Sequence, residues 1–151
     1  MAPRFFGRFE HSLDVKGRVI LPARYRGSFD TMAYLSKHQE GCLALWTPEE
    51  FDKQLEEMEA AQDRGTAERN IARVWSAGIT DVELDRQGRV AIPAYLREYA
   101  QLESAVLVVG ALNRIELWNP AEWERRVSPA EAHFIDPDAQ EAPAPGADRE
   151  E

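Results

Sequence analysis

The chain has 151 residues, of which 44% are hydrophobic and 30% charged, and a formal net charge of −9. This length fits one compact domain or two very small ones. It has no run near the roughly 18 apolar residues of a membrane helix and no signal-peptide stretch at residues 1–7, so we expect a cytoplasmic protein. A single cysteine, Cys42, excludes an internal disulfide, and His11, His38 and His133 lack the spacing of a zinc site.

The charge is unevenly distributed along the chain. Averaged over all residues, the acidic balance argues against a nucleic-acid partner, because phosphate binding depends on Lys and Arg. Residues 1–28, however, carry six basic residues against two acidic ones, whereas residues 128–151 carry seven acidic residues against one basic. The first segment is therefore a basic patch. The Pro- and Ala-rich tail is predicted to be disordered, either as a solvated tail or as a competitor of nucleic acid for the basic face.

An internal repeat is the strongest signal in the sequence. Residues 13–26 recur at 84–97 with an offset of 71, and residues 43–51 match 115–123 with an offset of 72. Because the matching blocks occur in the same order, the chain contains two copies of one supersecondary unit. A unit this small buries little surface, so we expect the two copies to share one core.

Each copy is predicted to begin with a strand that leads into a tight turn. Residues 9–13 and, less strictly, 79–84 alternate apolar and polar side chains, which is typical of a half-buried strand. In the turns at 14–17 and 85–88, a glycine can supply positive φ and an aspartate can bond the backbone ahead, so each turn should close a hairpin. Return strands are expected at 18–20 and 89–91, followed by short helices that begin at Pro22 and Pro93 and end near Ser28 and Gln101.

The second block of each copy predicts a strand followed by a helix. Residues 42–46, 105–109 and 115–118 are apolar runs of strand length. Thr47 and Asn119 each precede a proline and stand three residues before a glutamate, a combination that begins a helix.

Between the copies, apolar residues from Phe51 to Trp75 recur at helical spacing with a break at 64–66, which predicts two helices that end at Gly78. The acidic side chains of the first of these helices fall on the face opposite its apolar residues, as expected for a solvated face. They are Glu49, Glu50, Asp52, Glu56, Glu57 and Glu59.

The repeated Asp-x-x-x-Arg pair, Asp14 with Arg18 and Asp85 with Arg89, allows two interpretations. A helical salt bridge has the same spacing, but the glycine before each arginine and the β-type residues after it favour a turn. Each aspartate could then pair with its own arginine and only fix the turn. Alternatively, a two-stranded ribbon or its loop enters the major groove of DNA, where arginine can donate two hydrogen bonds to guanine O6 and N7.

Further basic residues of the first copy are expected to contact phosphates, which provides affinity without sequence preference. They are Arg4, Arg8, Lys16, Arg24 and Arg26. The second copy has Gln87 in place of Lys16 and Tyr95 in place of Arg24, so the first copy is expected to dominate DNA contact.

Over residues 5–127 these motifs together resemble the MraZ family. The resemblance rests on the two Asp-x-x-x-Arg pairs, two Gly-Arg-Val-x-[Leu/Ile]-Pro-Ala stretches, the opening Phe-x-Gly-Arg-Phe-Glu-His-Ser-Leu-Asp, and two strand-Trp-x-Pro blocks. It implies an α+β fold in which tandem SpoVT/AbrB-like swapped-hairpin units form an intramolecular pseudo-dimeric β-barrel with flanking helices. The expected division is a first repeat at 5–52, connecting helices at 53–78, a second repeat at 79–127 and the acidic tail at 128–151.

The resemblance also implies a function. A member of this family would be a bacterial transcriptional regulator that binds short direct repeats in double-stranded promoter DNA upstream of the division and cell-wall gene cluster, including its own promoter. It would form a ring-shaped homo-oligomer, associate with the nucleoid and need no cofactor. The family's motif arginines correspond to Arg18 and Arg89, with Asp14 and Asp85 as their partners.

Catalysis is not expected, because the sequence has no nucleophile elbow, no Gly-rich phosphate loop and no metal-ligand cluster. We therefore expect no small-molecule substrate. Cys42 lies in an apolar run and should be a buried core residue. The open alternative is a ring-forming scaffold or protein-interaction module whose arginines serve subunit contacts. The four tryptophans fit either function, mostly through packing: Trp46, Trp75, Trp118 and Trp123.

Overall fold

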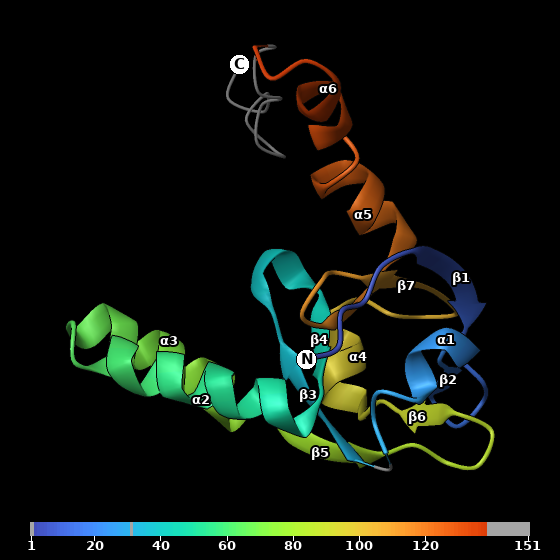
Figure 1. Cartoon of the computed structure of the whole chain (residues 1–151), viewed down its shortest axis with the longest axis horizontal. Helices are drawn as coiled ribbons and strands as arrows, with labels where there is room; N and C mark the ends of the chain where they lie inside the picture. Colours follow the sequence, from blue (N-terminus) through green and yellow to red (C-terminus); the bar gives the residue numbers. More distant parts are fainter. Residues whose placement is uncertain (1, 31, 139–151) are drawn as a thin grey trace.

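The computed structural model describes residues 2–30 and 32–138. Figure 1 shows their elements, which combine strands and helices and confirm the α+β class. In chain order they are β1 (Arg8–Ser12), β2 (Arg18–Ile20), α1 (Ala23–Arg26), β3 (Met32–Lys37), the short 3-10 helix η1 (Gln39–Gly41), β4 (Leu43–Trp46), α2 (Pro48–Gln62), α3 (Thr66–Ala77), β5 (Thr80–Glu83), β6 (Arg89–Ala91), α4 (Ala94–Tyr99), β7 (Ala105–Gly110), β8 (Ile115–Trp118), α5 (Pro120–Arg126) and α6 (Ala130–Ile135).

The strands of the two copies interleave in one antiparallel sheet with the order β1-β7-β8-β4-β3-β5. By the repeat, β1 corresponds to β5, β3 to β7 and β4 to β8, so the order is unchanged when every strand is replaced by its counterpart and read from the other end. β1 of the first copy pairs with β7 of the second, and β5 of the second pairs with β3 of the first. Within the described residues no ladder joins the edge strands β1 and β5, so the expected closed barrel is not observed.

The predicted turns are present, but the hairpins are not. Gly17 and Gly88 have φ values of 76° and 79°, and Gly17 N–H donates to the Asp14 carbonyl at 3.0 Å. The return strand β2 does not form a ladder with β1, however. It pairs with β6, its counterpart in the other copy, in a separate two-stranded ribbon. A three-residue strand has few local partners, and this pairing places Val19 opposite Val90, both fully buried.

Both copies contribute to one hydrophobic core. β4 and β8 lie at the centre of the sheet, and all four residues of each are buried. The main cluster joins Val19, Leu21 and Leu43 of the first copy to their repeat counterparts Val90, Ile92 and Ile115 of the second. Because each copy completes the core of the other, the two form a single folding unit.

The connecting segment forms the two predicted helices, which project from the body as a hairpin (Figure 1). The Thr47 hydroxyl accepts a hydrogen bond from Glu50 N–H at 3.3 Å where α2 begins, and Gly65 lies at the break before α3. Phe51 and Trp75 anchor the base of the hairpin in a cluster with Trp46. No helix in the described ranges is long and apolar enough to span a membrane.

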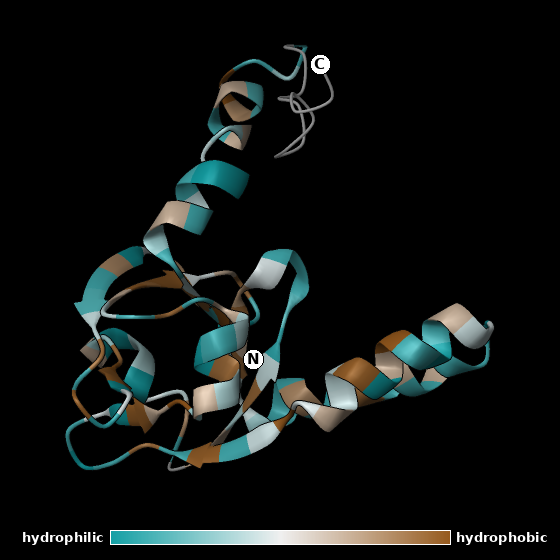
Figure 2. Cartoon of the chain, turned by 180° about the vertical axis from the view of Figure 1, so that it is seen from behind, coloured by the Kyte–Doolittle hydropathy of each residue, from teal (hydrophilic) through white to brown (hydrophobic). Residues whose placement is uncertain are grey.

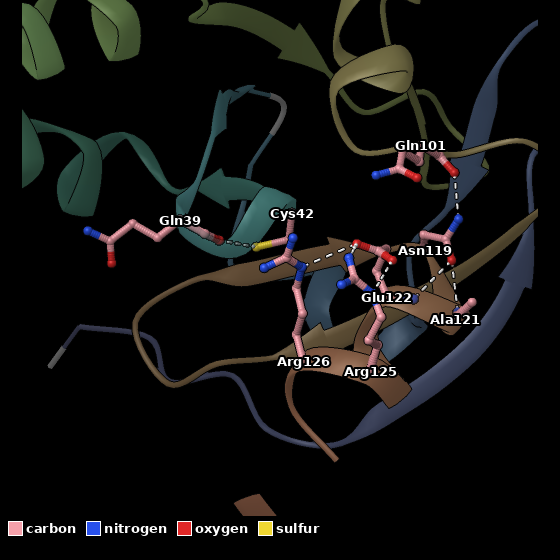
Figure 3. Close-up of polar contacts among 8 residues, drawn as sticks. All are labelled: Gln39, Cys42, Gln101, Asn119, Ala121, Glu122, Arg125 and Arg126. Atoms are coloured by element: carbon pink, nitrogen blue, oxygen red, sulfur yellow. Dashed lines mark hydrogen bonds and ion pairs between the residues drawn. The ribbon is translucent and has the colours of Figure 1, made fainter. Parts of the chain in front are cut away.

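The helices α5 and α6 form a second projection at the end of the described chain. Figure 3 shows how α5 begins: the Asn119 side chain accepts hydrogen bonds from Ala121 and Glu122 N–H and donates one to the Gln101 carbonyl at 2.7 Å. The short helix α6 lies within the tail from residue 128 that was predicted to be disordered, and it begins after Pro129. Residues 139–151 of that tail lie outside the described residues.

Candidate nucleic-acid interface

The two Asp-x-x-x-Arg turns have the same hydrogen-bond geometry. Asp14 Oδ1 accepts from the backbone N–H groups of Lys16 and Arg18, each at 2.9 Å, and Asp14 Oδ2 accepts from Arg18 Nε at 2.7 Å. Asp85 makes the corresponding bonds to Gln87 and Arg89 at the same distances. Each aspartate therefore holds both the turn and the arginine that follows it.

The aspartates stay ionised well below neutral pH. Hydrogen bonds from the backbone N–H of Arg18, and after it from the Arg18 side chain, lower the pKa of Asp14, and those from Arg89 lower the pKa of Asp85 in the same way. The Asp–Arg pairs thus keep their charges at neutral pH. These bonds fix each turn, and they are compatible with both interpretations of the pair.

The motif arginines retain free donors. Only Nε of Arg18 and Arg89 is engaged by the aspartate, and no other hydrogen bond or ion pair to either guanidinium exists within residues 2–30 and 32–138. Their side chains are 27% and 31% exposed. A guanidinium held through Nε still presents Nη1 and Nη2, a planar pair of donors that matches two adjacent acceptors.

The β2–β6 ribbon brings these two arginines together. Arg18 lies opposite Ala91, and Arg89 lies opposite Ile20, in an antiparallel ladder of three residue pairs. Side chains alternate along a strand, so Arg18 and Arg89 share the ribbon face that is opposite to the buried Val19 and Val90. Diagonal positions of this kind have Cα atoms about 7–8 Å apart. Two arginines that are 71 positions apart in the chain thus lie on one face of the ribbon.

A further arginine pair, Arg26 and Arg97, lies beside the same ribbon. Arg26 Nε donates to the Leu21 carbonyl at 2.9 Å, and Arg97 Nε donates to the Ile92 carbonyl at 3.0 Å. Arg26 is among the residues predicted from the sequence to contact phosphates, whereas Arg97 is not. The signal was present, because Arg97 is the counterpart of Arg26 at the repeat offset of 71.

The other predicted basic residues are distributed differently. Lys16 is exposed in the first turn, close to the motif arginine. Arg8 stands at the far end of β1, where its Nη2 is 3.8 Å from Glu124 Oε1 and its guanidinium lies over the Trp123 ring. Arg24 lies 4.8 Å from the centre of the Phe6 ring, and Arg4 donates to the Pro3 carbonyl. The structure therefore groups Lys16 and Arg26 with the motif, and Arg8 with α5.

Cys42 and three of the four tryptophans lie in the interior of the molecule. Cys42 is fully buried, its thiol donates to the Gln39 carbonyl (Figure 3), and burial raises its pKa, so it stays a neutral thiol at physiological pH. No group of three His, Cys, Asp or Glu residues in the described ranges is placed to hold a metal ion. Trp46, Trp75 and Trp118 are buried, as expected for packing.

Comparisons with known proteins place this geometry in a family. A family model described as "MraZ protein, putative antitoxin-like" matches residues 5–74 and 76–143. Relatives named "Transcriptional regulator MraZ" include one from Nocardioides sp., 37% identical over 94% of this chain and 99% of its own length, and one from Kocuria rhizophila, 37% identical over 92% and 97%. Another, from Desulforamulus reducens, is 35% identical over 86% of this chain and 92% of its own length. The match covers both copies of the repeat, and the chain belongs to the MraZ family.

Proposed function

We propose that this chain is a sequence-specific, DNA-binding transcriptional regulator that reads double-stranded DNA with the β2–β6 ribbon. The observation that carries the proposal is the pair of arginines, Arg18 and Arg89, held on one ribbon face with their terminal nitrogens unengaged. Relatives at 35–37% identity carry the name of transcriptional regulators, which supports the same function.

The ribbon suits the major groove of DNA, which is wide enough to admit a two-stranded β-ribbon. In this proposal Nη1 and Nη2 of each motif arginine donate to guanine O6 and N7. Asp14 and Asp85 act as positioning residues, because their oxygens are already occupied by the turn and by Arg Nε. Holding a long side chain in one orientation before binding reduces the entropy lost in the complex.

Phosphate contacts complete the proposed interface. Lys16 and Arg26 lie beside the motif arginines and would bind the phosphates that flank the bases. Arg4, Arg8 and Arg24 are assigned to more distant phosphates, although Arg8 and Arg24 first have to leave Trp123 and Phe6. We therefore expect substitution of Lys16 or Arg26 to weaken DNA binding more than substitution of Arg4, Arg8 or Arg24.

A ring-shaped homo-oligomer that binds short direct repeats is part of the proposal. Its support is apolar surface on both projections: Ile71 and Val74 of α3 are 60% and 59% exposed, and Phe134 of α6 is 87% exposed. Figure 2 shows hydrophobic segments on the α2–α3 hairpin. Each added subunit of an oligomer binds a repeated site at high effective concentration, so modest single contacts multiply.

The finer expectations from the family resemblance belong to the same proposal. They are promoter sites upstream of the division and cell-wall genes and of the chain's own gene, a nucleoid-associated location, and a pseudo-dimeric arrangement of two repeats at 5–52 and 79–127. The strand order, unchanged by exchange of the two copies, supports the pseudo-dimer.

Nuclease footprinting on the DNA upstream of this chain's own gene tests the function. The wild-type protein should protect short, regularly spaced segments, and the Arg18→Ala/Arg89→Ala double variant should protect none at the same concentration. Light scattering on both proteins serves as the control, because loss of binding is informative only if the oligomer is unchanged. Normal protection by the double variant would remove the main support for the proposal.

The alternative function, a scaffold whose arginines serve subunit contacts, is favoured by the exposed apolar residues of α3 and α6. It predicts the opposite pattern. The double variant would then dissociate in light scattering, and the wild-type protein would protect no DNA.

A further inference from the structure

The arginines Arg26 and Arg97 cross between the two copies. A Cβ atom placed on Gly17, in the first turn, would lie 2.9 Å from Arg97 Cζ, and one placed on Gly88, in the second turn, would overlap Arg26 Nε. Each guanidinium thus lies on the turn of the other copy. Both glycines are buried, although Lys16 and Gln87 next to them are exposed, because the crossing arginines cover the turns.

Two hydrogen bonds and one packing contact hold each crossing arginine in place. Leu21 N–H donates to the Gly88 carbonyl at 2.9 Å, the Leu21 carbonyl accepts from Arg26 Nε, and the Arg26 guanidinium then covers Gly88. The other copy has the same arrangement: Ile92 N–H donates to the Gly17 carbonyl at 3.0 Å, and the Ile92 carbonyl accepts from Arg97 Nε at 3.0 Å. The orientation of each crossing arginine is therefore set by the backbone of the ribbon.

The charge of the crossing arginines is not compensated. Within the part of the chain that the structure describes, neither Arg26 nor Arg97 has a carboxylate partner, and their Nη atoms make no hydrogen bond. Arg114, at the other end of the sheet, lies 2.7 Å from Glu116, and Arg125 lies 2.6 Å from Glu122 (Figure 3). Half-buried guanidinium groups placed next to another arginine repel one another unless an anion binds between them.

We propose that each DNA-contacting turn is a composite of both copies. Arg18 and Arg97 act together at the first turn, and Arg89 and Arg26 act together at the second. The crossing arginine binds the phosphate next to the base that the motif arginine reads, so a turn of one copy is incomplete without the helix that follows the ribbon strand of the other. This inference rests on the proposed function and adds Arg97, and the exchange between copies, to it.

A double-mutant cycle tests the composite turn, because only the pairing of arginines across copies distinguishes it from two independent turns. The variants are Arg18→Ala, Arg89→Ala and Arg97→Ala, and the doubles that combine Arg97→Ala with each of the other two. The probe is a fluorescein-labelled duplex from the DNA upstream of the chain's own gene, with a shuffled duplex of the same composition as the reference. Titrations at several salt concentrations give the affinity and its salt dependence.

Arg97→Ala should weaken binding to both duplexes by a similar factor, about three- to tenfold, and should reduce the slope of log affinity against log salt by about 0.9. When it is combined with Arg18→Ala, the loss should differ from the product of the single losses by about threefold or more, since the two residues share a site. When it is combined with Arg89→Ala, the losses should multiply. Arg97→Lys, which keeps the charge, should restore the salt slope.

The controls separate structure from contact. A cooperative unfolding transition and an unchanged oligomer in light scattering qualify each variant, and Arg97→Gln replaces Arg97→Ala if truncation prevents folding. If the Arg97 variants bind DNA with the affinity and salt slope of the wild-type protein, the composite turn is overturned and the proposed function is not. The same holds if the effect of Arg97→Ala is coupled to that of Arg89→Ala and not to that of Arg18→Ala. Wild-type protein that binds neither duplex overturns both the proposed function and this inference.

Discussion

The two Asp-x-x-x-Arg turns have the same internal hydrogen bonds but different neighbouring residues. The three hydrogen bonds that each aspartate side chain accepts have the same lengths in both turns, down to 2.7 Å between Asp Oδ2 and Arg Nε. Around them, Arg24 of the first copy corresponds to Tyr95 of the second, whose hydroxyl donates to the Gly78 carbonyl. The motif thus determines the geometry of each turn, whereas residues outside the motif determine its electrostatic surroundings.

The difference in charge lies mainly beside the turns. Lys16 has no charged counterpart at Gln87, but Arg86 precedes Gln87 in the second turn, so each turn carries one additional cation. The approaching strands differ more, because β1 contains Arg8 and Glu10 whereas β5 contains two acids and no base. A more acidic approach to the second turn raises the cost of bringing phosphates there.

The largest expected effect is the loss of a motif arginine. Arg18→Ala should weaken binding to promoter DNA by about 30- to 100-fold, and Arg89→Ala by about tenfold, because a bidentate base contact contributes about 1–3 kcal/mol and the first copy has the more favourable electrostatic surroundings. Fluorescence titration at one fixed salt concentration measures both. Equal losses would show that the difference in charge has no effect on recognition.

Substitution of the turn glycines should destabilise the two turns to different extents. Gly17→Ala and Gly88→Ala both force a side chain into positive φ, at a cost of about 1–2 kcal/mol, and Gly88→Ala should cost more because its Cβ overlaps Arg26. Denaturant unfolding measures the change in the free energy of unfolding.

Two further glycines provide matched controls for these variants. Gly41 has a φ of 86° and no atom within 4 Å of an added Cβ, so Gly41→Ala isolates backbone strain. Gly27 has a φ of −64° and equally open space, so Gly27→Ala should cost nothing. If Gly88→Ala is no more destabilising than Gly41→Ala, the crossing arginine does not restrict that position.

Exchange of the unmatched turn residues should shift the balance between the copies. Lys16→Gln should lower the slope of log affinity against log salt by about 0.9, and Gln87→Lys should raise it by the same amount, since each changes one phosphate contact. The change in affinity should be similar on specific and shuffled duplexes. A slope that neither variant changes would place the turns away from the phosphates.

The smallest effect is expected from pH. The pKa values of Asp14 and Asp85 are lowered by the hydrogen bonds of their turns, so the ionised carboxylates stabilise the fold above the ordinary Asp pKa of about 3.9. This stabilisation is lost as the pH falls through the lowered values. The Asp14→Asn/Asp85→Asn variant should therefore be less stable than wild type at pH 7, with a difference that shrinks in acid. Denaturant unfolding of both proteins at pH 7 and at acidic pH tests this. A stability difference between them that is the same at both pH values would contradict it.

Several elements could be predicted because their causes are local. Thr47 and Asn119 cap the helices that follow them, and the break at Gly65 separates α2 from α3 as expected. The same holds for the turns, where positive φ at Gly17 and an aspartate acceptor are properties of a five-residue segment.

Other features depended on partners distant in the chain. β3 (Met32–Lys37) was not predicted, although it is the counterpart of β7, because its residues alternate weakly and gain their burial from β4 and β5. The hairpin prediction was wrong for the same reason: β2 finds its partner 71 residues away. The repeat identifies Arg97 as the counterpart of Arg26, but its place on the turn of the other copy depends on the tertiary structure.

The sequence by itself determined the repeat, the turn geometry and the identity of the motif arginines, since these follow from side-chain chemistry at short spacing. Only the tertiary structure decided which strands pair between the copies, that Arg18 and Arg89 share one ribbon face, and that Arg26 and Arg97 each cover the turn of the other copy. The physical reason is burial. A single copy cannot bury the apolar faces of its own strands, so each copy buries them against the other, and the same exchange brings the four arginines together.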